Sequence, residues 1–130
     1  MHNYRDVLMI PKINKTLTRL KINIKFTSLQ SKIMTGIFIA YNQAYYMEIV
    51  ELLEKNYSKG FTRWNEISGR GSRGGEPHMG SHTWPTFNDA ILTFVEDEFV
   101  DNILNDLHEL DTKTEELGIR AFSWKIDKTI

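Results

Sequence analysis

The sequence of 130 residues has no cysteine, only three prolines and no long hydrophobic run. The absence of cysteine excludes a disulfide framework, a thiolate metal site and a cysteine nucleophile. Because a membrane-spanning helix needs about 20 consecutive apolar residues, the short apolar runs predict no membrane insertion. The residues that are present, 41% hydrophobic and 25% charged, are typical of one ordinary globular domain.

Positive charge is scarce beyond the first 33 residues. Residues 1–33 carry seven Lys or Arg against a single acid, Asp6, which gives a net charge of +6. Residues 34–130 carry nine Lys or Arg against sixteen acids, which gives a net charge of −7. Since a phosphate backbone attracts an excess of Lys and Arg, the charge of this larger region predicts no nucleic-acid partner.

The basic segment 1–33 lacks the pattern of a folded unit. Residues 20–26 alternate apolar and polar side chains as a strand does, but no turn or partner strand is adjacent. Lysines interrupt every candidate for a secretory core, and only two of the seven cations are the arginines that transit peptides favour. We therefore predict a dispensable or misassigned extension, a cytoplasmic protein, and a domain that starts at Met34. A targeting segment and an arm that packs on the domain or on a neighbouring subunit are the alternatives.

Hydrophobic periodicity in residues 34–130 predicts four strands and two helices. Apolar side chains recur at three- and four-residue steps in 44–57 and again in 99–110, as on the buried face of a helix. Asn42 is the expected N-cap of the first helix, and Gly60 ends that unit. The expected elements are, in order, strand 36–41, a helix after Asn42, strand 61–67, loop 68–85, strand 86–95, a helix around 99–110 and strand 119–126.

The order β-α-β-β-α-β predicts an α+β, ferredoxin-like fold, in which two helices cover one face of a four-stranded antiparallel sheet. The other face then needs cover, and strand aromatics are its candidate residues. In a domain of this size, assembly into an oligomer usually buries such a face. The alternative divides the aromatics between the core and a partly exposed sheet. The aromatics in question are Phe61, Trp64, Phe122 and Trp124.

Most of the functional signal lies in the glycine-rich loop 68–85. Its glycines permit positive φ and let the backbone approach a ligand closely. Arg70 and Arg73 are able to bind a phosphate or carboxylate through paired hydrogen bonds, so Gly69, Gly71 and these arginines predict an anion site. The alternative is a mobile loop whose arginines only maintain solubility.

The same loop holds a possible set of metal ligands. His78 and His82 are four residues apart and Glu76 precedes them, but Pro77 and Gly80 argue against the helix that would place both imidazoles on one face. Convergence on a loop or across a subunit interface stays open, and so does a purely structural role. Because no paired carboxylates, nucleophile elbow or Ser/His/Asp pattern is present, we do not expect an enzyme.

These motifs together resemble the PII-like superfamily of nitrogen-regulatory signalling proteins. The match begins with Gly60-Phe61-Thr62 opening the second strand, Glu66 near its end and Gly69-Arg70-Gly71 entering the long loop. A poorly characterised bacterial branch is more similar still. It shares Gly75-Glu76-Pro77-His78, then His82 and Trp84-Pro85, and a chain end like Arg120-Ala121-Phe122-Ser123-Trp124. The resemblance covers 34–130 and leaves 1–33 unmatched.

The resemblance implies a homotrimer that binds a small effector in the clefts between subunits and docks on a protein target through loop 68–85. Classical members bind ATP, ADP and 2-oxoglutarate, but this sequence departs from their pattern in two places, and the second of these puts a nucleotide in doubt. Loop 68–85 has no tyrosine for uridylylation, and 111–118 lacks the Gly/Arg-rich phosphate turn. The related CutA-like branch is associated with divalent metals, so a metal-binding trimer is the alternative. The candidate ligand-binding residues are Gly69, Arg70, Gly71, Arg73, Glu76, His78, His82 and Trp84.

Overall fold

The computed structural model describes residues 32–71, 74, 76–114 and 118–130. The predictions for 1–31 and for Arg73 lie outside these residues. The elements are β1 (Met34–Asn42), a 3-10 helix η1 (Gln43–Tyr45), α2 (Tyr46–Lys55), β2 (Phe61–Ile67), β3 (Asn88–Glu96), α3 (Asp97–Lys113) and β4 (Arg120–Lys125). This is the predicted β-α-β-β-α-β order.

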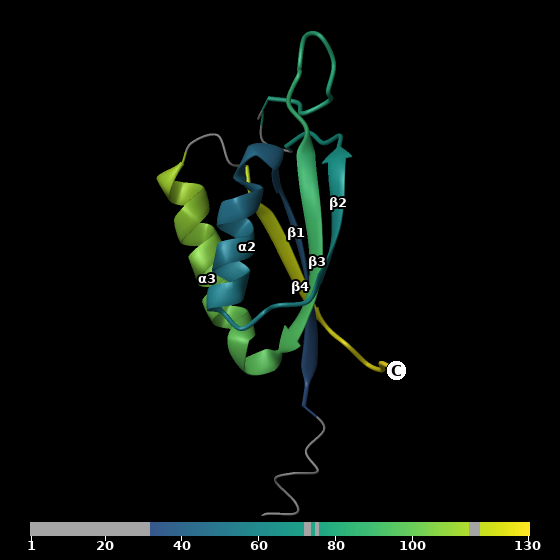
Figure 1. Ribbon diagram of the computed structural model, residues 1–130, viewed down its shortest axis with the longest axis vertical. Helices are drawn as coiled ribbons and strands as arrows, with labels where there is room; N and C mark the ends of the chain where they lie inside the picture. The colour runs from purple at the N-terminus through teal and green to yellow at the C-terminus, as the bar shows by residue number, and fades with distance from the viewer. Residues whose placement is uncertain (1–31, 72–73, 75, 115–117) are drawn as a thin grey trace, which may run out of the picture. The chain divides into compact units, whose positions relative to one another are not determined.

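The four strands form one antiparallel sheet in the order β2-β3-β1-β4. Both helices pack on the same face of this sheet, and the opposite face carries no helix among the described residues (Figure 1). The α+β, ferredoxin-like fold class is therefore confirmed.

The element boundaries differ from prediction where local hydrogen bonds intervene. Asn42 does cap a helix, but its side chain accepts a hydrogen bond from the amide of Ala44 at 3.1 Å and so caps η1 rather than α2. The third strand begins at Asn88, two residues later than expected, so the loop before it extends to Phe87.

The core lies between the helices and the alternate residues of the two central strands. On β1, Ile37, Ile39 and Tyr41 are fully buried, at the period of two that a half-covered sheet requires. From the helices, Ile49 and Leu53 of α2 meet this layer, and α3 adds residues at helical spacing. The remaining members of the core are Ile91, Val95, Val100, Ile103, Leu107 and Ile119.

The other face of the sheet is apolar but exposed. Trp64, Phe122 and Trp124 lie on it as predicted, with 45%, 61% and 44% of their surfaces exposed. Phe94, which the sequence reading did not select, joins them at 51%. The prediction for Phe61 was wrong, because this residue pairs with the buried Thr93 and packs against the core.

Trp124 packs closely against the strand next to it. Its Cα partner on β1 is Gly36, and a Cβ at position 36 would come within 2.9 Å of the indole. Glycine is therefore needed here for a close approach of side chain to backbone. Around Trp124, the exposed face is thus closely packed between neighbouring strands.

Candidate functional site

The loop between β2 and β3 extends beyond one end of the sheet (Figure 1). Its stem is closed by two backbone hydrogen bonds between Gly69 and His78, each 2.8 Å long, which form an isolated antiparallel bridge. Arg70, the next residue, is exposed beside this bridge. The structure therefore places two predicted site residues in direct contact and a third immediately next to them.

Asn88, the first residue of β3, is the polar contact at the base of this stem. The carboxamide Oδ1 of Asn88 lies 2.5 Å from Nδ1 of His78. Because a carboxamide oxygen only accepts, His78 donates from Nδ1. A Cβ on Gly69 would come within 2.8 Å of the same carboxamide, so the glycine lets the stem close over Asn88.

The tip of the loop has its own turn. Ser81 and Trp84 exchange hydrogen bonds: the amide of Ser81 donates to the carbonyl of Trp84 at 2.8 Å, and the amide of Trp84 donates to Ser81 Oγ at 3.1 Å. Gly80 has φ of 61°, and the ring of Phe87 occupies the space that a side chain there would need. Trp84 is half-buried, so it supports the turn as well as being a candidate ligand contact.

The possible metal ligands do not converge within one chain. Glu76 and His82 are exposed, whereas His78 is half-buried and bound to Asn88. Across the part of the chain that the structure describes, no group of three His, Asp or Glu side chains is placed to hold a metal ion. The two histidines and the glutamate therefore form no three-ligand site in the single chain.

A β-bulge marks the point where β2 becomes the loop. Trp64 pairs with Ala90 and Ile67 with Asn88, so β2 advances three residues while β3 advances two. Within the bulge, Glu66 has φ of 55°, which costs a non-glycine residue about 1–2 kcal/mol. Its amide donates a 3.0 Å hydrogen bond to Oδ1 of Asp89, which holds the bulge in place.

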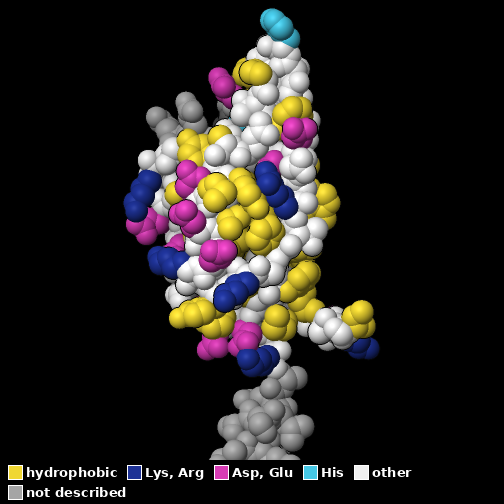
Figure 2. Space-filling model, viewed as in Figure 1, with side chains coloured by type: hydrophobic (Ala, Val, Ile, Leu, Met, Phe, Trp, Pro, Cys, Tyr) yellow, Lys and Arg dark blue, Asp and Glu magenta, His cyan; other side chains and the backbone are white. Residues whose placement is uncertain are grey.

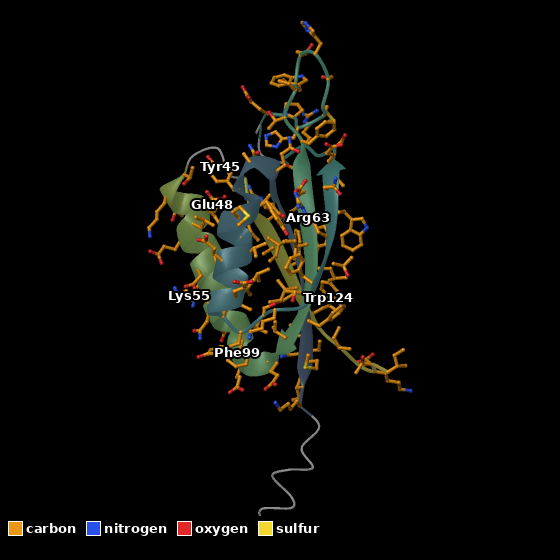
Figure 3. The ribbon with its side chains drawn as sticks, viewed as in Figure 1. Tyr45, Glu48, Lys55, Arg63, Phe99 and Trp124 are labelled. Carbon is orange, nitrogen blue, oxygen red and sulfur yellow. The ribbon has the colours of Figure 1, made fainter. Side chains whose placement is uncertain are left out.

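Asp89 is a fully buried carboxylate that sequence reasoning did not select. Its Oδ2 accepts from Nε of Arg63 at 2.9 Å and also from Nη2 of the same guanidinium. The Arg63 Cζ lies 3.6 Å from the centre of the Tyr46 ring, so the guanidinium is stacked as well as paired. Figure 3 labels Arg63 among the side chains of the sheet. Burial lowers the pKa of Arg63, but the hydrogen bond and charge of Asp89 outweigh it and the pKa lies above its ordinary value.

Tyr41 is the Cα partner of Asp89 on β1 and is also fully buried. Among the described residues, its hydroxyl makes no hydrogen bond of good geometry, although the Arg63 guanidinium lies close enough to lower the pKa of this hydroxyl. Burial and the nearby charge of Asp89 raise the pKa of Tyr41 above its ordinary value, against a smaller lowering by Arg63. The buried Tyr41 and Asp89 thus form a polar cluster with the partly exposed Arg63, next to the loop stem.

Two other surface features do not involve the loop. A hollow of about 290 Å³ lies at the opposite end of the sheet between α3 and β4, where Asp97 accepts hydrogen bonds from Thr35 and Lys125. In Figure 2, apolar side chains are exposed in the middle of the viewed face, with acidic and basic side chains interspersed around them.

No helix in the described part of the chain is long and apolar enough to cross a membrane.

Comparison with known proteins gives a result for the fold alone. No protein-family model and no curated protein matches the chain. Among solved structures, the chain is similar to CPII, a nitrogen regulatory PII-like protein from Thiomonas intermedia K12, bound to ADP, AMP and bicarbonate. This match has a TM-score of 0.58 and 18% identity, over 74% of this chain and 90% of that one.

Two further structures agree with this match. CPII bound to ADP and bicarbonate gives a TM-score of 0.57 and 19% identity, over 74% of this chain and 90% of that one. A putative PII-like signalling protein from Thermus thermophilus gives a TM-score of 0.55 and 23% identity, over 72% of this chain and 87% of that one. The chain therefore has the fold of the PII-like proteins, as the sequence resemblance predicts.

Proposed function

We propose that this protein is a PII-like regulator rather than an enzyme. In this proposal it binds a small anionic effector in the clefts between the subunits of a cytoplasmic homotrimer and signals through loop 68–85. The observation that carries the proposal is the exposed Arg70 beside the fixed Gly69–His78 stem, at the end of a sheet whose uncovered face is aromatic. A cation held next to an ordered backbone bridge is a suitable first contact for an anion.

The uncovered face supports the assembly. Four large aromatic side chains on one face, each between 44% and 61% exposed, form the kind of apolar surface that usually marks an interface. A second and a third copy of the chain would cover it and would bring the loop of one subunit next to its neighbour. Light scattering tests this step, and a monodisperse monomer at micromolar concentration would remove the cleft from the proposal.

The chemistry of the structural neighbours supports an anionic effector. CPII is bound to ADP, AMP and bicarbonate, each of which carries negative charge. Arg70 forms no ion pair with another residue of the described part of the chain, so its guanidinium is available to such a ligand. Adenine nucleotides, with and without bicarbonate, are therefore the first effectors to test.

Calorimetry of the full chain against ADP, AMP and bicarbonate tests the anion site. Arg70→Ala should weaken the binding of ADP about tenfold or more, because one charge-assisted contact contributes about 1.5–3 kcal/mol and 1.4 kcal/mol is tenfold. The matched control is Lys59→Ala, which removes an exposed cation before the other end of β2 and should leave the affinity unchanged. Binding that ignores Arg70→Ala would contradict the anion assignment.

The metal-binding trimer is the competing hypothesis, and the same calorimetry with Zn²⁺ and Cu²⁺ distinguishes it. Its ligands would be Glu76, His78 and His82, drawn together across subunits, since they do not meet within one described chain. Tight binding that is lost in both His78→Ala and His82→Ala, and that fades below about pH 6 as imidazoles protonate, would favour this hypothesis over the anion site.

A further inference from the structure

The base of loop 68–85 depends on one buried carboxylate. Asp89 joins two parts of β2 that would otherwise be independent: Arg63 in the regular strand and the amide of Glu66 in the bulge. These contacts use both carboxylate oxygens, and the carboxylate is fully buried. A buried charge without such partners would be strongly unfavourable, so the folded state holds all three groups together.

The bulge decides which face of the strand each later residue presents. With the bulge, Ile67 pairs with Asn88, whereas an unbulged strand would pair Glu66 with Asn88 and send Ile67 to the other face. The same one-residue slip would move Gly69 away from His78 and turn Arg70 to the opposite side. Because side chains alternate along a strand, the bulge determines the side on which the loop residues that follow it lie.

The bulge is not favoured by its own sequence. Glu66 is a poor residue for the left-handed region, where glycine and asparagine are the usual occupants. Such a conformation persists only where surrounding contacts impose it. Among the described residues, the contact that does so is the hydrogen bond from the Glu66 amide to Asp89.

We propose that Asp89 is a positioning residue that sets the bulge at Glu66 and thereby the face on which loop 68–85 presents Arg70. Arg63 is its partner, since the guanidinium neutralises the buried carboxylate and is itself held against the ring of Tyr46. This inference rests on the proposed function in one respect only: the role of Arg70 as an anion contact. The geometry of the stem can be measured without any ligand.

The first test is hydrogen exchange of the full chain without ligand. In Asp89→Ala, the amides of Gly69 and His78 should exchange at least tenfold faster, because the stem loses its fixed alignment. The internal control is the amide of Ile126, which bonds to Met34 at the opposite end of the sheet and should keep its rate. Faster exchange at all three amides would mean global destabilisation, and unchanged exchange at the stem would mean no positioning role; either overturns the proposal.

Two further variants keep the proposal testable if Asp89→Ala does not fold. Asp89→Asn retains an oxygen for the Glu66 amide and should keep most of the stem protection. Glu66→Asn, in the otherwise unchanged chain, relieves the strain in the left-handed region and should slow exchange at Gly69 and His78. Adding Glu66→Asn to a folded Asp89 variant should restore part of the protection. If Glu66→Asn leaves exchange at the stem unchanged in both backgrounds, the bulge does not control the loop.

Titration with ADP in the presence of bicarbonate links the stem to binding. A folded Asp89→Ala variant with a mobile stem should bind ADP at least fivefold more weakly than the unchanged chain. Equal affinity despite faster exchange at the stem would overturn the step from loop geometry to binding. If the unchanged chain binds no ADP, the proposed effector is wrong, whereas the positioning of the loop is still decided by the exchange rates.

Discussion

The sheet face that packs on α2 and α3 differs in chemistry from the face on the other side. The covered face of β1 and β3 carries aliphatic residues such as Ile37, Ile39 and Ile91, all fully buried. The uncovered face carries aromatics such as Phe94 and Trp124, about half exposed. Neighbouring residues of the same strand therefore have two environments: the single chain buries one set beneath its helices and leaves the other set exposed.

This comparison separates the stability of the subunit from its assembly. Substitutions on the covered face should destabilise the chain itself, whatever its concentration. Substitutions on the uncovered face should act mainly on association and should therefore depend on concentration.

Ile91→Ala should have the largest effect. Ile91 is fully buried between strand and helices, and truncating such a residue leaves a cavity that costs about 2–5 kcal/mol of unfolding free energy. Urea unfolding at low protein concentration measures this loss. The matched control is Phe94→Ala on the same strand, which should cost less than half as much under these conditions. An equal loss from the two variants would contradict the difference between the faces.

Phe122→Asp should abolish the proposed assembly while sparing the subunit. Phe122 is 61% exposed in the single chain, so a charge there is solvated before association and buried after it. Light scattering should show a monomer, whereas Lys128→Asp, beyond the last strand, should leave the mass unchanged. An intact oligomer in the Phe122 variant would show that the uncovered face is not the interface.

Tyr41→Phe should stabilise the subunit by up to about 1 kcal/mol near neutral pH, because it removes a buried hydroxyl that lacks a partner among the described residues. The gain should grow in alkali. The pKa of Tyr41 is raised in the folded state, so the protonated hydroxyl contributes its full stabilisation of the fold below the unfolded pKa of about 10. Above that pH the unfolded chain loses the proton first, and the stability of the unchanged protein falls.

Urea unfolding at about pH 8 and about pH 10.5 measures both parts of the Tyr41 prediction. The variant should lose less stability between the two pH values than the unchanged chain does. A stability that falls equally in both proteins would show that Tyr41 does not titrate on unfolding. A lower stability of the variant at pH 8 would mean that the Tyr41 hydroxyl of the unchanged chain has a hydrogen-bond partner in solution.

Asp106→Asn should have the smallest effect, at about 0.5–1 kcal/mol near pH 7. The hydrogen bond from Asn56 is the main cause that lowers the pKa of Asp106, and Lys55 adds to it. Because the pKa of Asp106 is lower in the folded chain, the ionised carboxylate stabilises the fold above the unfolded pKa of about 3.9. That stabilisation is lost as the pH falls through the folded pKa. The difference between variant and unchanged chain should therefore vanish in acid, and a constant difference would contradict the cause.

The elements could be predicted because their signals are local. The alternation in β1 and the helical spacing of Val100, Ile103 and Leu107 need no knowledge of the rest of the chain. The face of an edge-strand aromatic is a different matter, since it depends on pairing. Phe61 was misplaced because its face depends on how β2 aligns with β3. Phe94 was overlooked because it stands in the nearly continuous apolar run 90–95, which reads as wholly buried and hides the alternation of the strand.

The candidate site was predicted only in part. The glycines and the arginine of the stem are contiguous in the sequence, so they could be recognised as a motif. The cluster of Asp89, Arg63 and Tyr41 joins three strands, and no local pattern connects its members. One signal was available in β3, where every second position faces the core: 89, 91, 93 and 95. Asp89 is the first of these positions, and a buried acid requires a partner of opposite charge or a hydrogen-bond donor.

The strand order also has a consequence for how the protein is made. β1 is synthesised first, but its two neighbours are β3 and β4, and Met34 pairs with Glu96 while Thr35 pairs with Lys125. Pairing between such distant segments makes folding slow relative to helical proteins, because long loops must close before these strand pairs form. On the ribosome, the isoleucines of β1 therefore emerge well before their partners. We expect this strand to be the segment that a chaperone binds in the nascent chain.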